Sequence, residues 1–160
     1  MAIQENDKLP EMELIIVDGD GQKKKSSADV LGKGRAVVFA VPGAYTPTCS
    51  AKHLPGFVGR LADLKAKGVD TIACLSVNDA FVMEAWGKDA GAMDGVVMIA
   101  DFDAAFTKAL GLSFDGSAFG LGERAQRFAL IAEDGVVKQL FVEEPGAFEV
   151  SSAEHVLRHL

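Results

Sequence analysis

The chain has 160 residues, of which 49% are hydrophobic and 24% charged, and its formal net charge is −7. This length and composition predict one soluble globular domain over residues 1–160 that buries its core without disulfides or metals. The negative charge argues against nucleic acid and anionic membranes as partners. No apolar stretch approaches the ~20 residues that a membrane helix needs, so no membrane segment is expected.

Cysteine usage and the N-terminal segment together predict a cytoplasmic location. The first residues lack a basic start followed by an apolar run, so we expect no secretory signal. The two cysteines, Cys49 and Cys74, are too few for a disulfide framework in a chain of this length. A reducing cytoplasm is therefore the expected compartment.

Apolar runs mark the predicted strands. Residues 12–17 precede the turn signal Asp18-Gly-Asp-Gly21, which predicts a hairpin whose return strand carries Lys23–Lys25. Continuous apolar runs of strand length are typical of central strands covered on both faces, and four follow: 36–41, 72–77, 96–100 and 128–131.

Helical patterns separate these strands. The first follows Cys49 and stops at Gly68, and Pro55 predicts a kink one turn after the cysteine. Two more helices are expected, one capped by Asn78 or Asp79 and running through Trp86 to Gly87, the other capped by Asp103 and running through Leu110 to Gly111.

The chain closes on a hairpin and a helix. Glu133-Asp-Gly135 is a tight turn between strands at 128–132 and 136–142, and a last helix covers about 152–160. The order β-α-β-α-β-α-β-β-α predicts an α/β fold of the thioredoxin type, with a central mixed β-sheet flanked by helices.

The segment Pro42-Gly-Ala-Tyr-Thr-Pro-Thr-Cys49 leaves an apolar strand and delivers Cys49 where a helical pattern begins. The positive end of the helix dipole and the free N–H groups there favour a thiolate. Its neighbours are turn and cap residues, which indicates a nucleophile rather than a packed core thiol. Disulfide exchange of the thioredoxin type needs Cys-x-x-Cys, but Thr46 occupies the first of these positions.

The stretch PGAYTPTCSAKHLPGF resembles the active-site segment of peroxiredoxins, in particular the type II branch that includes the peroxiredoxin-five subfamily. The resemblance covers nearly the whole chain, including ACLSVNDAFVMEAWGK, RFALIAEDGVV and VEEPGAFEVSSAEHVL. The family pattern P-x-x-x-T-x-x-C is met by Pro42, Thr46 and Cys49, and the arginine before a strand by Arg127.

This resemblance implies a thiol-dependent peroxidase that reduces hydrogen peroxide and organic hydroperoxides without a cofactor or metal. Cys49 would attack the peroxide and become a sulfenic acid. Arg127 would stabilise the thiolate and the leaving oxygen, Thr46 would hydrogen-bond the peroxide, and Pro42 would shield the site. Arg124, in a glycine-rich loop, is expected to be a surface or supporting residue.

The second half of the catalytic cycle depends on Cys74, which lies in the middle of a predicted strand and is expected to be a buried, protonated thiol. A role as resolving partner of Cys49 remains the alternative. Some type II members carry a resolving cysteine near the C-terminus, but residues 149–152 contain none. The expected cycle therefore uses one cysteine and glutathione or glutaredoxin as reductant, with thioredoxin as the alternative.

Three other features are open to more than one interpretation. His53, four residues after Cys49, permits a Cys–His hydrolase, although we expect its side chain to point away from the cysteine. His155 and His159 have a spacing that can bind zinc, but no third ligand is near, so no metal site is expected. Apolar residues at 111–122, which include Phe114, Phe119 and Leu121, suit a core satellite. The resemblance implies a homodimer and suggests that they instead line the peroxide pocket or form the dimer contact.

The main alternative to an enzyme is a redox sensor or partner-binding module. Oxidation of Cys49 would then change a surface instead of turning over a substrate. Thr46 and Arg127 argue against this alternative, because both suit a rapid attack on peroxide.

Overall fold

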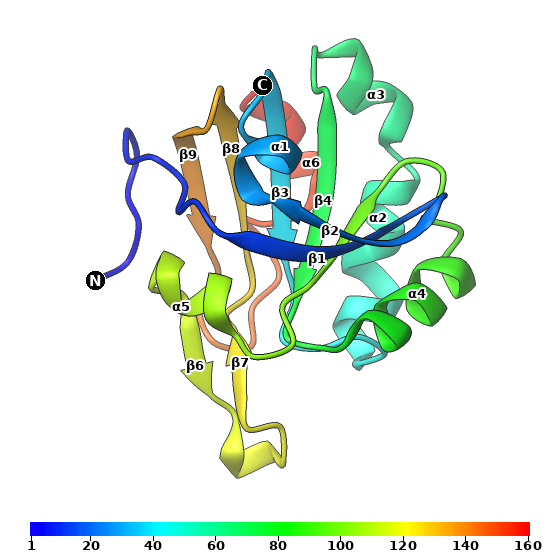
Figure 1. Ribbon diagram of the computed structural model, residues 1–160, viewed down its shortest axis with the longest axis vertical. Coiled ribbons are helices and arrows are strands. Elements are labelled where there is room, and N and C mark those ends of the chain that lie inside the picture. The colour runs from blue at the N-terminus through cyan, green and yellow to red at the C-terminus, as the bar shows by residue number, and fades with distance from the viewer.

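A seven-stranded mixed sheet forms the centre of the computed structural model, which describes residues 1–160, and its strand order is β2-β1-β5-β4-β3-β8-β9 (Figure 1). Strands β3, β4 and β5 are parallel to one another and all other neighbours are antiparallel. The strands are β1 (Glu13–Asp18), β2 (Gly21–Ser26), β3 (Arg35–Ala40), β4 (Thr71–Ser76), β5 (Val97–Ala100), β8 (Phe128–Glu133) and β9 (Val136–Val142). The predicted mixed sheet and both predicted hairpins are confirmed.

Helices cover both faces of the sheet (Figure 1). One face packs against α2 (Leu54–Val58), α3 (Leu61–Ala66), α4 (Ala80–Asp89) and α6 (Ala153–Arg158), and the other against α1 (Ser27–Leu31) and α5 (Ala105–Leu110). Along β3, Val37 and Phe39 join the first core and Ala36 and Val38 the second. This double burial explains why the central strands are continuous apolar runs.

The predicted first helix is divided into three pieces. It begins with a π-helical turn, η1 (Cys49–His53), in which the Leu54 N–H reaches the Cys49 carbonyl. Pro55 has no N–H to donate to an earlier carbonyl, so the wider turn accommodates the predicted kink. The chain breaks again at Gly59 before α3, which ends at Ala66 ahead of Gly68.

The limits of two other helices differ from the prediction. Helix α4 starts after its cap Asp79 but continues past Gly87 to Asp89. Gly87 does not end the helix but allows close packing, since a Cβ there would lie 2.5 Å from the Met93 sulfur. For α5 the main cap is the buried Asp101, which accepts hydrogen bonds from the N–H groups of Phe106 and Thr107. The predicted cap, Asp103, accepts only from the Ala105 N–H.

The structure contains two small elements that the sequence pattern did not predict, a short helix and a small hairpin. Helix α1 is too short to show a periodicity, although Ser26 caps it by accepting from the Asp29 N–H. The glycine-rich segment forms a separate hairpin, β6 (Ser113–Asp115) and β7 (Glu123–Ala125), with a 3₁₀ turn, η2 (Ser117–Phe119), between its strands. No helix has the length and apolar character required to cross a membrane.

Candidate active site

The loop that follows β3 is held in place by residues around α4. The Asn78 side chain accepts a hydrogen bond from the Ala44 N–H at 2.9 Å. Tyr45 has a left-handed φ of 63°, and its hydroxyl donates to Asp89 at 2.6 Å. The loop is therefore anchored at its turn, which places the residues that follow it.

Cys49 is the first residue of η1 and its side chain is completely buried. The next residue, Ser50, accepts a hydrogen bond from the Trp86 indole at 3.0 Å, and its N–H donates to the Thr46 carbonyl at 2.9 Å. These bonds hold the first turn of the helix against α4. The cysteine thus lies in the core and not on the surface of the loop.

Arg127 is brought to Cys49 by the register of the sheet. Strands β3 and β8 are antiparallel and pair Ala40 with Phe128, so the residue before β8 lies at the edge where β3 ends. There the Arg127 Nη2 donates to the Cys49 Sγ at 3.1 Å. A hydrogen bond from a guanidinium to the sulfur of a buried cysteine is an arrangement typical of reactive cysteines.

His53 points toward this pair, which corrects our expectation that it points away. Its Nδ1 lies 2.8 Å from Arg127 Nη1, and its Nε2 lies 2.9 Å from the Ser151 carbonyl oxygen. Burial and then the Arg127 charge lower the pKa of His53 to about 3, so the ring is neutral. The partners assign the proton to Nε2, which leaves Nδ1 to accept from Arg127.

The physical reason for this correction is helical geometry. Residues four apart lie on the same side of a helix, and burial of both Cys49 and His53 turns that side toward the sheet. The ring also lies against Phe39 and Phe148, each with a centroid distance of 5.0 Å. His53 is therefore placed to orient Arg127, which is a different task from the acid–base chemistry of a hydrolase.

A buried carboxylate, Glu143, supports the far side of His53. Its Oε2 accepts from the Glu149 N–H at 2.7 Å, the Ser151 N–H at 2.8 Å and the Ser151 hydroxyl at 2.7 Å. Burial opposes ionisation, but the hydrogen bonds from Ser151 and the neighbouring amides lower the pKa of Glu143 below its usual value. The Glu143 N–H also donates to the Arg127 carbonyl at 3.0 Å. Sequence reasoning missed Glu143, because nothing in the pattern marks it as buried.

Thr46 and Pro42 lie in the loop before the cysteine. The Thr46 hydroxyl donates to the Gly43 carbonyl at 2.7 Å, which leaves its oxygen free to accept a further hydrogen bond. Pro42 is half-buried, and its carbonyl accepts from Arg124 Nη1 at 3.3 Å. Arg124 also donates to the Leu121 carbonyl at 2.9 Å, so it links the β6–β7 hairpin to the loop.

Cys74 is completely buried in β4, within the same core cluster as Cys49. Burial, followed by the nearby Cys49, raises the pKa of Cys74 well above its usual range. The predicted burial is confirmed, and the raised pKa favours the protonated thiol. Such a thiol is a poor nucleophile as long as the strand keeps it in the core.

The remaining candidates lie away from the Cys49 sulfur. His155 is half-buried and His159 is exposed, and both rings pack on Phe141, with centroids 4.7 and 4.9 Å away. Phe119 is 79% exposed, whereas Phe114 and Leu121 are partly buried. The hairpin that carries them borders the active-site loop through Arg124.

In this fold a buried cysteine lies at the start of a helix and an arginine contacts its sulfur. These features define a thiol-dependent oxidoreductase of thioredoxin-like architecture. The Redoxin family model matches residues 4–157. Peroxiredoxin-2E (chloroplastic) of Arabidopsis thaliana is 50% identical over 99% of this chain and 70% of its own length. Peroxiredoxin-2E-2 (chloroplastic) of Oryza sativa subsp. japonica is 53% identical over 99% of this chain and 73% of its own length.

Solved structures agree with these relatives. Reduced Prx3 of Vibrio vulnificus in complex with hydrogen peroxide is 48% identical, covers 98% of both chains and superposes with a TM-score of 0.92. The chain belongs to the peroxiredoxin family and is a thiol-dependent peroxidase. The likeness to the five subfamily is weaker, since peroxiredoxin 5 of Alvinella pompejana is 29% identical with a TM-score of 0.85 over 98% of this chain and 96% of its own.

The comparisons correct the expected compartment. The cytoplasmic prediction is wrong when measured against the two relatives at 50% and 53% identity, both of which are chloroplastic proteins. The cysteine count could not separate these possibilities, because a buried free thiol is compatible with any reducing compartment.

Proposed function

We propose that Cys49 is the peroxidatic residue and that its sulfenic acid is reduced by an external thiol. The observation that carries this proposal is the 3.1 Å hydrogen bond from Arg127 to the buried Cys49 sulfur. No other cysteine has a cation donating to it in this structure, and Cys74 is held protonated by burial.

The first step consumes the peroxide. The Cys49 thiolate attacks the terminal peroxide oxygen, an S–O bond forms and the O–O bond breaks. Sulfur is oxidised to the sulfenic acid, and the second oxygen, reduced and protonated, leaves as water or an alcohol. The Vibrio vulnificus relative holds hydrogen peroxide, which supports this class of substrate.

Each of the other three residues has a role in this step. Arg127 lies against the sulfur and offers its charge to the leaving oxygen. The Thr46 oxygen, whose own proton is directed to Gly43, accepts a hydrogen bond from the peroxide and aligns it with the sulfur. Pro42, half-buried at the start of the loop, limits the access of water.

The second step regenerates the thiol, and we propose glutathione or glutaredoxin as its source. An external thiol is supported because the chain offers no accessible internal one: Cys74 is buried, and residues 149–152 contain no cysteine. Turnover by thioredoxin alone, lost in a Cys74→Ser variant, would contradict this part of the proposal.

The test of the first step is a mass measurement. The reduced protein is treated with one equivalent of hydrogen peroxide, and its intact mass and peptides are recorded. A gain of one oxygen on Cys49 supports the mechanism. Loss of two hydrogens would indicate a Cys49–Cys74 disulfide, and an unchanged mass would overturn the assignment of Cys49.

We also propose that residues 1–160 work as one redoxin domain within a homodimer. Tyr45, Phe81 and Phe102 follow the carboxyl ends of β3, β4 and β5, so these residues, which are 50%, 76% and 59% exposed, lie toward one edge of the sheet. Exposed aromatic side chains gathered near a site suit a contact with a second copy. Sedimentation of the wild type and of Phe81→Glu tests this, because the charge is expected to yield monomers.

A further inference from the structure

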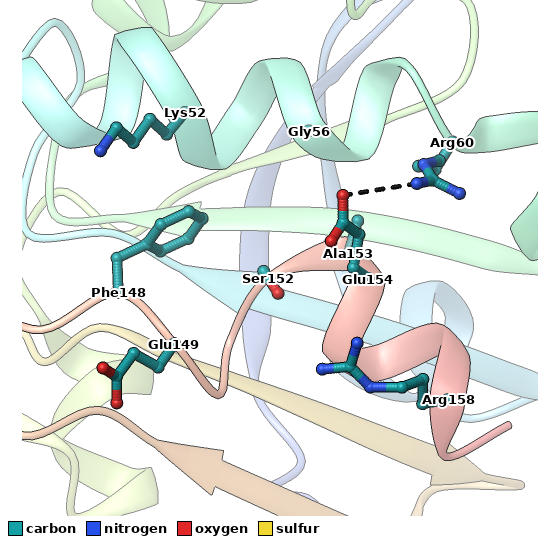
Figure 2. Close-up of a pocket in the computed structure, with 9 residues that line it drawn as sticks. All are labelled: Lys52, Gly56, Arg60, Phe148, Glu149, Ser152, Ala153, Glu154 and Arg158. Atoms are coloured by element: carbon teal, nitrogen blue, oxygen red, sulfur yellow. Dashed lines mark hydrogen bonds and ion pairs between the residues drawn. The ribbon is translucent and has the colours of Figure 1, made fainter.

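A cleft of about 370 Å³ lies next to the peroxide site, between the helical segment that begins at Cys49 and the C-terminal segment. Figure 2 shows Lys52, Gly56 and Arg60 along one side and residues of the C-terminal segment along the other. Small-molecule sites have volumes of about 300–1,000 Å³, so this cleft suits a ligand at the lower end of that range. The second side is formed by Phe148, Glu149, Ser152, Ala153, Glu154 and Arg158.

Phe148 lines the cleft and also contacts the residues around Cys49. Its ring centroid is 5.0 Å from that of His53 and 5.8 Å from the Arg127 guanidinium carbon. Arg127 in turn is bonded to the Cys49 sulfur at 3.1 Å. The side chains of Phe148 and Arg127 thus lie between a ligand in the cleft and the Cys49 sulfur.

The charges that line the cleft are only partly used within the protein. Arg60 pairs with Asp63 and with Glu154, each at 3.4 Å. Lys52 and Arg158 are exposed and form no ion pair, and neither does the exposed Glu149 carboxylate. Two cations and one carboxylate without ion pairs are therefore among the residues that line this cleft, in a chain whose net charge is −7.

We propose that this cleft binds glutathione as the resolving thiol, an inference that rests on the proposed reduction of Cys49 by an external thiol. Glutathione carries carboxylates at both ends, which suit Lys52 and Arg158, and an ammonium group, which suits Glu149. An uncharged dithiol such as dithiothreitol has no group for any of these partners.

The chemistry is a pair of thiol exchanges. The glutathione sulfur bonds to the Cys49 sulfur, the S–O bond of the sulfenic acid breaks and the oxygen leaves as water. A second glutathione thiolate attacks the mixed disulfide, so that glutathione disulfide leaves and the reduced Cys49 returns. Because Cys49 is fully buried, the first exchange requires its side chain or Phe148 to move, and the cleft holds the thiol close at that moment.

The proposal is tested with charge-reversal variants of the cleft, whose steady-state turnover is measured with excess peroxide. We expect Arg158→Glu to raise the apparent KM for glutathione about fivefold, and Lys52→Glu/Arg158→Glu about tenfold or more. The ratio of glutathione-supported to dithiothreitol-supported turnover should fall in parallel. Added salt should raise the KM of the wild type and have less effect on the double variant.

The matched control is Lys33→Glu, which makes the same change of charge on an exposed lysine before β3, at the end of the strand away from Cys49. Equal KM values for Arg158→Glu and Lys33→Glu would overturn the proposal. So would a loss confined to glutaredoxin-supported turnover, because the cleft would then dock a protein. Failure of the proposed peroxidase mechanism can be distinguished from failure of this proposal. In that case the wild-type protein would consume no peroxide even with dithiothreitol as reductant.

Discussion

The Nδ1 of His53 lies 2.8 Å from the Nη1 of Arg127, and this contact links the helix that carries Cys49 to the residue that precedes β8. The other terminal nitrogen of Arg127 donates to the sulfur. The guanidinium is therefore oriented by a neutral histidine on one side and directed to the Cys49 sulfur on the other. Each of the following predictions tests one link around this arginine.

Removal of the histidine should misplace the arginine. We expect His53→Leu to slow the reaction of Cys49 with hydrogen peroxide about 10–100-fold, because a partly buried N–H of Arg127 loses its acceptor, at a cost of ~1–3 kcal/mol. His53→Gln, whose amide oxygen can accept the same hydrogen bond, should retain more of the rate. Stopped-flow oxidation of Cys49 measures both, and equal losses would contradict an orienting role.

Replacement of the arginine should have a larger effect. We expect Arg127→Lys to lower the peroxide rate constant about 10²–10³-fold, since an ammonium group cannot contact the sulfur and His53 in the same geometry. Arg124→Gln serves as the comparison, because the hydrogen bonds of the Arg124 side chain go to the Pro42 and Leu121 carbonyls and not to Cys49. We expect Arg124→Gln to lower the peroxide rate constant less than Arg127→Lys does. A larger decrease in Arg124→Gln would assign the catalytic role to Arg124.

Acid should destabilise the native protein through His53. The pKa of His53 is about 3 when folded, against 6.5 for the ordinary group, so only the unfolded chain binds this proton between those values. Stability is then lost as pH falls below about 6.5, at up to about 1.4 kcal/mol per pH unit. His155 contributes in the same direction, and Glu143 only at lower pH.

Urea unfolding at several pH values checks this prediction. The comparison is between the wild type and His53→Gln, since His155 and Glu143 are present in both proteins. We expect the slope of unfolding free energy against pH to be smaller in the variant between pH ~5 and ~6.5. Identical slopes would show that His53 takes up its proton in the folded protein as well.

The carboxylate behind His53 should matter for both stability and rate. Glu143→Gln weakens the acceptor for two backbone N–H groups and the Ser151 hydroxyl. We expect a loss of about 1–3 kcal/mol of unfolding free energy, and slower oxidation of Cys49 because the Ser151 carbonyl no longer holds His53 in place. The exposed neighbour offers a control, Glu144→Gln, whose rate should match the wild type.

Cys74 should be dispensable for turnover. We expect Cys74→Ala to keep glutathione-supported peroxide consumption, with some loss of stability from the small cavity left in β4. Cys49→Ser should abolish consumption in the same assay. A one-cysteine cycle is contradicted if Cys74→Ala accumulates oxidised Cys49 in the presence of glutathione while the wild type does not.

Much of the fold was readable in the pattern of residues. The central strands are buried on both faces, so they appear as unbroken apolar runs such as 36–41, and the turns at Gly21 and Gly135 have positive φ values that glycine favours. The hairpin β6–β7 was missed because its strands are short and lie in a glycine-rich segment. The cap Asp101 was missed because its importance comes from burial, which a local pattern does not show.

The sequence by itself determined which groups are available for the proposed chemistry: a cysteine at the start of a helix, Thr46 three residues before it, and an arginine just before a strand. These signals are local, since each depends on residues next to one another in the chain. Only the tertiary structure decided how they cooperate. The pairing of β3 with β8 sets Arg127 beside Cys49, and the return of the C-terminal segment places Ser151 and Phe148 against His53. Such contacts join residues 74 to 98 positions apart, so they depend on strand register and packing and leave no local trace.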